Sequence, residues 1–128
     1  MVTAEKIFMP DLSMFASIVE PKQYPVGHWF FHPGDAGDVM YIVLSGEVNI
    51  VINEKIVEVV RPGGMFGEMA VIDNRERSAG ARAVAPTEAA PIDQRQFLEL
   101  VRTHPLFSIE VMSVMTDRLR LLNQMLMF

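Results

Sequence analysis

The chain has 128 residues, of which 50% are hydrophobic and 21% are charged, a composition typical of a soluble globular protein with one core. It contains no cysteine, which excludes disulfide bridges and thiolate metal sites, and its net charge of -5 disfavours binding of a nucleic-acid backbone. No apolar run approaches the roughly eighteen residues of a membrane span, and no basic segment with a long apolar stretch marks a secretory signal. We therefore expect a cytoplasmic protein without direct nucleic-acid or membrane partners.

The N-terminal two thirds of the chain predict one short helix followed by many strands. Residues 11–19 combine an N-cap candidate, Asp11, with apolar residues at helical spacing. From about residue 24 to residue 93, short runs rich in Val, Ile and Phe alternate with Gly, Pro, Asn and Asp, which predicts an antiparallel β-sandwich or barrel. Turns that need a positive φ or close backbone approach are indicated by five glycines: Gly34, Gly37, Gly46, Gly63 and Gly64.

Residues 94–128 predict two helices. The first covers about 94–103 and ends at the His104–Pro105 pair, because a residue before proline disfavours the helical conformation. The second begins at Pro105, a residue favoured at the first helical position, and runs to the C-terminus. No repeat or linker divides the chain, so we expect one domain over residues 1–128.

The last helix carries two apolar stripes. One contains Met112, Met115, Leu119, Leu122 and Leu126; the other contains Phe107, Val111, Val114, Leu121, Met125 and Phe128, and is interrupted by Arg118. Two stripes exceed what a helix lying on one surface needs, which favours a homodimer formed through this helix. The alternative is a single, deeply buried helix.

Residues 66–80, FGEMAVIDNRERSAG, place an acid and an arginine on either side of a short apolar turn. Gly67 permits close backbone approach, and the small residues Ser78, Ala79 and Gly80 leave room for a ligand beside Arg77. A carboxylate such as Glu68 accepts hydrogen bonds from sugar hydroxyls, and a guanidinium forks onto phosphate. The segment therefore predicts a pocket for a ligand with a ribose and one phosphate.

The stretch FGEMAV, followed at this distance by RSA, resembles the phosphate-binding cassette of the cyclic nucleotide-binding domain family. Residues 24–51 resemble the first strands and turns of that family, and the likeness covers about residues 12–125. It implies a mainly β fold: a double-stranded β-helix, or jelly-roll-like β-roll, with a short N-terminal helix, a cassette helix and two C-terminal helices.

The resemblance also implies the site. Gly67 and Glu68 would hold the ribose 2′-hydroxyl, and the N–H groups of Met69 and Ala70, with Arg77 and Ser78, would hold the cyclic phosphate. Phe66 and Ala79 flank these positions, and Asn123 of the last helix would contact the base. The family often has proline before the cassette arginine, where this chain has Glu76.

A metal-dependent enzyme of the cupin type is the main rival, because the chain has His28, His32 and His104. His28 and His32 are four residues apart, which separates their Cβ atoms by about 13 Å in a flat strand at about 3.3 Å per residue. No Ser or Thr has a convincing His and acid partner, so no nucleophile is indicated. We expect neither an enzyme, nor a metal, nor a cofactor.

The sequence thus predicts a regulatory module that binds cyclic AMP, or cyclic GMP, and converts binding into movement of its C-terminal helices. Two alternatives stay open besides the enzyme. The chain could be the sensor of a transcription regulator without its DNA-binding part, or a structural module of this fold that binds no ligand. The downstream protein partner is not indicated by any residue.

Overall fold

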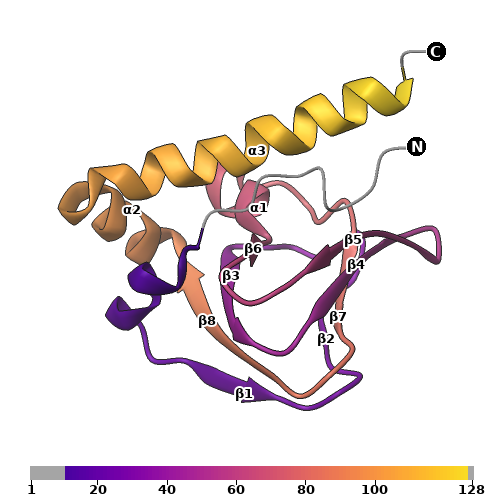
Figure 1. The fold of residues 1–128 in the computed structure, drawn as a ribbon, viewed down its shortest axis with the longest axis horizontal. Coiled ribbons are helices and arrows are strands. Elements are labelled where there is room, and N and C mark those ends of the chain that lie inside the picture. Colours follow the sequence, from indigo (N-terminus) through magenta and orange to yellow (C-terminus); the bar gives the residue numbers. More distant parts are fainter. Residues whose placement is uncertain (1–10, 127–128) are drawn as a thin grey trace.

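The computed structural model describes residues 11–126, and its β-strands form two four-stranded sheets (Figure 1). The first sheet has the order β1 (Lys22–Tyr24), β8 (Thr87–Asp93), β3 (Val39–Ser45) and β6 (Met65–Phe66). The second has the order β2 (Trp29–Phe31), β7 (Gly80–Ala83), β4 (Val48–Ile52) and β5 (Lys55–Val60). All pairings are antiparallel, and the chain crosses repeatedly between the sheets, which confirms the predicted mainly β fold with flanking helices.

Strand β3 shows why these sequences form a layered structure. Its side chains alternate, as those of any strand do, so that one face meets the helices and the other meets the opposite sheet. Met40 and Ile42 belong to the core beneath the helices, whereas Val43 belongs to the core between the two sheets. All three are fully buried, and the strand therefore ties the two cores together.

The short helices lie where the sequence predicts them, with one difference. The N-terminal element η2 (Ser13–Ile18) is a 3-10 helix whose N-cap residue is Leu12. Asp11, the predicted cap, instead accepts hydrogen bonds from the backbone N and the hydroxyl of Ser13, at 3.0 Å and 2.6 Å. The cassette helix α1 (Glu68–Asp73) lies between β6 and β7.

The two C-terminal helices begin where the sequence predicts them, and the first also ends there; the predicted end of the second lies outside the described residues. Helix α2 (Gln94–Thr103) is capped by the Asp93 side chain, which accepts from the N–H of Gln96 at 2.8 Å. Helix α3 (Pro105–Leu126) lies across one end of the β-roll, above β6 and α1 (Figure 1). No helix in residues 11–126 is both long and apolar enough to cross a membrane.

The two predicted stripes of α3 have different surroundings. Phe107, Val111 and Val114 are buried in the core beneath the helices, where Phe107 packs edge-on against Phe15 at 5.1 Å between ring centroids. The other stripe is largely open, with Met112, Leu119 and Leu122 exposed. The side chain of Leu126 and all of Phe128, which complete the predicted stripes, lie outside the described part.

Candidate functional site

A cavity of about 360 Å³ opens between β6, α1, the segment that follows α1, and α3. It is lined by every site residue predicted from the sequence except one: Phe66, Gly67, Glu68, Met69, Ala70, Arg77, Ser78 and Ala79. The exception is Asn123, which is exposed on α3 and does not line the cavity. The remaining lining comes from residues that the sequence did not indicate: Phe31, Ile50, Ile52, Glu58, Asp73, Arg75, Glu76 and Arg118.

Arg77 is buried, with only 7% of it exposed, and its contacts hold it in a fixed position. Its Nη1 donates to the carbonyl of Gly67 at 2.8 Å, and its Nη2 donates to the carbonyl of Val39 at 2.5 Å. The guanidinium also lies over the Phe31 ring, 3.9 Å from the centroid. Burial lowers the pKa of Arg77, against the opposing effects of Tyr41 and of nearby acids. The cation is therefore positioned by carbonyl groups and an aromatic ring.

The Nε of Arg77 is buried and has no hydrogen-bond partner among the described residues. Leaving a buried donor unsatisfied is costly, and the Arg77 side chain also lines the cavity. An anion bound in the cavity would compensate the charge of this guanidinium.

Two glycines make room for the Arg77 side chain. Gly67 has a φ of +81° and is the N-cap of α1, and a Cβ atom there would lie 3.0 Å from Arg77 Nη1. Gly37 has no unusual φ, but a Cβ atom there would overlap Arg77 Nε and lie 2.8 Å from its Cδ. Gly37 is therefore required by the close approach of a side chain, and not by a turn.

We expect Gly37→Val to destabilise the fold, because the added side chain must displace an arginine that two carbonyls hold in place. Overpacking of this kind costs about 1–3 kcal/mol. Thermal unfolding followed by circular dichroism would measure the decrease in Tm. Ala36→Val, at the exposed neighbouring position, is the matched control and should leave Tm unchanged. Equal Tm values for the two variants would contradict this role of Gly37.

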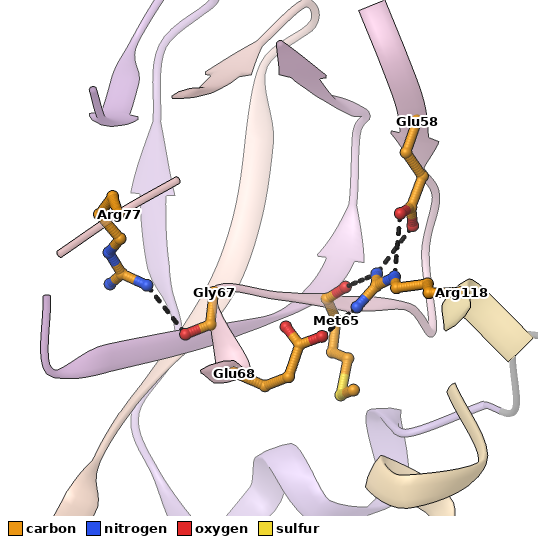
Figure 2. A network of polar contacts seen from close by, with 6 residues as sticks. All are labelled: Glu58, Met65, Gly67, Glu68, Arg77 and Arg118. Atoms are coloured by element: carbon orange, nitrogen blue, oxygen red, sulfur yellow. Dashed lines mark hydrogen bonds and ion pairs between the residues drawn. The ribbon is translucent and has the colours of Figure 1, made fainter. Parts of the chain in front are cut away.

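Glu68 lies on the other side of Gly67 and takes part in a network with α3 (Figure 2). It is only 4% exposed, and it accepts a hydrogen bond from Nη1 of Arg118. Arg118 also binds Glu58 of β5 through two hydrogen bonds, from Nε at 2.9 Å and from Nη2 at 2.7 Å. Its Nη2 donates in addition to the carbonyl of Met65, at 2.8 Å. Three separate elements, β5, β6–α1 and α3, are thereby joined at one wall of the cavity.

The two carboxylates of this network stabilise the positive charge of Arg118. Burial by itself lowers the pKa of Arg118, but the charges and hydrogen bonds of Glu68 and Glu58 together raise it above its usual value. Removing either acid would leave the guanidinium less well compensated, and removing Arg118 would leave two close carboxylates.

The sequence did not indicate Glu58 or Arg118 as site residues. They are separated from Glu68 by ten and fifty residues along the chain, and only the fold brings them together. One signal was available, because Arg118 is a single cation inside an otherwise apolar helical stripe. A charged residue at such a position is costly to bury unless it is paired, so it indicates an acid opposite.

The cavity thus combines three kinds of wall. Arg77 supplies a buried cation with an unsatisfied donor, Glu68 supplies a buried acceptor, and Phe31, Ile50 and Phe66 supply apolar surface. Its volume falls within the range of about 300–1,000 Å³ common for small-molecule sites. The arrangement suits a ligand with an anionic group, a hydroxyl and an apolar portion.

The chain is similar to many known proteins, as three examples show. The chain is 33% identical over 115 residues to the "Cyclic AMP receptor protein" of Thermus thermophilus, covering 86% of this chain and 53% of the relative. The solved structure of the Thermus thermophilus catabolite activator protein superposes with a TM-score of 0.80 at 31% identity, covering 91% of this chain and 57% of that one. A structure described with a cyclic-GMP-dependent signalling pathway in bacterial phytopathogenesis matches with a TM-score of 0.72 at 26% identity, covering 96% of both chains.

The chain spans about half the length of the curated relatives that it matches. The family model "Cyclic nucleotide-binding domain" matches residues 21–104, which include both sheets, α1 and α2. These residues also contain the whole cassette predicted from the sequence. The chain therefore belongs to the family of cyclic nucleotide-binding domains.

Proposed function

We propose that the cavity binds a cyclic nucleotide, with cyclic AMP preferred and cyclic GMP as the alternative. The observation that carries this proposal is that Arg77, a buried cation with an unpartnered Nε, lines the cavity. The cyclic phosphate would be bound by Arg77, Ser78 and the N–H groups of Met69 and Ala70. The ribose 2′-hydroxyl would be bound by Glu68.

The names of the relatives support the choice of ligand without deciding the base. The Thermus relative is called a cyclic AMP receptor protein, whereas another similar structure is described with cyclic-GMP-dependent signalling. Titration with a fluorescent cyclic AMP analogue, followed by competition with unlabelled cyclic AMP and cyclic GMP, would test the proposal and rank the two ligands. A protein that binds neither would instead be a structural module of this fold.

Glu68→Gln is expected to reduce the preference for cyclic AMP over its 2′-deoxy analogue. A hydrogen bond to a charged group contributes about 1.5–3 kcal/mol, so the wild-type protein should prefer the ribonucleotide by at least about tenfold. The variant should bind both ligands nearly equally, which competition titration would measure. Asp73→Asn, at another acid lining the cavity, is the control and should keep the preference. An unchanged preference in Glu68→Gln would exclude Glu68 from ribose binding.

We further propose that the module is a regulator and not an enzyme, and that its output is a movement of α3. The support is positional: α3 contributes Arg118 to the cavity and extends beyond it with exposed apolar side chains. We propose that these side chains form a homodimer interface. The cytoplasm remains the proposed compartment, on the basis of the cysteine-free sequence.

A sensor within a larger transcription regulator is a second candidate. It is favoured by the matched length, because the chain corresponds to about half of a Mycobacterium tuberculosis relative named a CRP-like cAMP-activated global transcriptional regulator. Nucleotide binding by the present chain is expected in either case.

A further inference from the structure

We infer that Glu58 and Arg118 are positioning residues that orient Glu68 for the ligand hydroxyl. Through this chain of contacts, the Glu58–Arg118–Glu68 relay, recognition of the ribose is coupled to the packing of α3 on the β-roll. The inference rests on the proposed function, because it assigns a regulation to the same carboxylate. Neither residue needs to touch the ligand for this role.

The contacts define an order within the relay. Glu58 binds Arg118 through both of its oxygens, at 2.9 Å and 2.7 Å, a bidentate geometry that fixes the plane of the guanidinium. The three hydrogen bonds to Glu58 and Met65 leave only the two N–H groups of Nη1, and one of these donates to Oε1 of Glu68. The second oxygen of Glu68 has no hydrogen-bond partner among the described residues, and it remains available to accept from a ligand.

Burial strengthens the contacts between the three charged side chains. The Glu68 side chain is 5% exposed, the Glu58 side chain 11% and the Arg118 side chain 21%, so water screens these charges weakly. If Glu58 released Arg118, the guanidinium would be free to fork onto Glu68 and occupy both of its oxygens. Glu58 therefore keeps one oxygen of Glu68 open by fixing the orientation of the guanidinium, so that Nη1 contacts Oε1 alone.

The position of Arg118 on α3 makes the coupling structural (Figure 2). Arg118 follows the buried Val114 by one helical turn on the same face, while Leu119 and Leu122 beyond it are exposed and Leu121 is half-buried. The relay is thus a polar anchor for the C-terminal part of α3 on the β-roll. Since coupling free energies are reciprocal, a ligand that uses Glu68 must also stabilise the docked helix.

Glu58→Gln provides the first test, measured as the ratio of the affinities for cyclic AMP and 2′-deoxy cyclic AMP. The relay predicts that this ratio falls by about tenfold, within the range expected for members of one polar network. Affinity for the 2′-deoxy analogue, which does not use Glu68, should not fall. Simple charge removal predicts the opposite result, because loss of an acid near an anion site would strengthen binding of both nucleotides equally. Glu54→Gln is the matched control, since it makes the same charge change at an exposed position of the same hairpin outside the cavity lining.

Arg118→Lys provides the second test. It keeps the positive charge but loses the fork that reaches two carboxylates at once. It should reduce the ratio as Glu58→Gln does, and the double variant should add little, because both changes interrupt the same relay. If the double variant lowered the affinity ratio by the product of the two single-variant factors, the relay would be wrong.

Hydrogen exchange of α3 amides in the wild-type protein tests the coupling without any variant. At saturating concentrations, cyclic AMP should slow exchange after Val114 more than the 2′-deoxy analogue does. Equal protection by the two ligands, or stronger binding of both by Glu58→Gln, would overturn the relay and leave nucleotide binding intact. If the wild-type protein binds neither nucleotide, the proposed function is wrong, and the relay that depends on it fails as well.

Discussion

Arg77→Ala is expected to weaken binding of cyclic AMP by at least about thirtyfold. Removing one partner of a desolvated charge pair typically costs about 2–5 kcal/mol, and about 1.4 kcal/mol corresponds to a factor of ten in affinity. The variant should also have a lower Tm, because the carbonyls of Gly67 and Val39 would lose their donor. Isothermal titration calorimetry at a temperature where circular dichroism shows the variant folded would separate the two effects.

Arg82→Ala is the matched control for this experiment. Arg82 lies on β7, is exposed, and approaches the Trp29 ring at 5.4 Å, outside the cavity lining. Its removal should leave the affinity for cyclic AMP unchanged. If Arg77→Ala were folded and bound cyclic AMP as tightly as Arg82→Ala, the assignment of the anion site would be wrong.

We expect the wild-type protein to form the proposed homodimer through α3 and Leu122→Glu to be a monomer. Leu122 is 51% exposed, and together with Met112, Leu119 and Met125 it forms an open apolar surface on α3. Burying a large apolar side chain contributes about 1.5–3 kcal/mol, so several such residues on each copy can offset the cost of association. A glutamate at the centre of such an interface would be buried without a partner. Light scattering coupled to size-exclusion chromatography would measure the mass in solution.

Gln124→Glu is the control for the dimer experiment. It makes the same change in charge two residues further along α3, at an exposed polar position on another face of the helix. This variant should remain a dimer. A wild-type chain that stays monomeric at high micromolar concentration would contradict the pairing role of α3.

Local signals in the sequence predicted a β-sandwich or barrel with flanking helices, and the family resemblance specified the β-roll. Alternating apolar runs with Gly, Pro, Asn and Asp between them predicted the strands, and the His104–Pro105 pair predicted the end of α2 and the start of α3. The form of the first helix was not predicted. Asp11 bonds to Ser13 as part of a local turn, and a short polar side chain can support such a turn as readily as an α-helix cap.

The lining of the cavity was predicted only where its residues are close in sequence. The cassette from Phe66 to Ala79 is contiguous, so its motif was sufficient to indicate an anion and a hydroxyl site. Glu58 and Arg118 belong to the site through β-strand pairing and helix packing, which no local pattern specifies. The predicted base contact, Asn123, failed to reach the cavity for the same reason: the direction of a side chain on α3 depends on how the whole helix packs.

The pairing of β4 with β5 has a consequence for the α3 anchor. Ile50 lies opposite Glu58, whereas the next residue, Val51, lies opposite Ile56, so Val57 is an extra residue in β5. Side chains of a strand alternate between its faces, and a shift in register by one residue would turn Glu58 from the cavity to the outer surface. The irregularity at Val57 therefore fixes which way the acid faces, and a single insertion or deletion in this hairpin would disconnect α3 from the cavity while leaving every cassette residue in place.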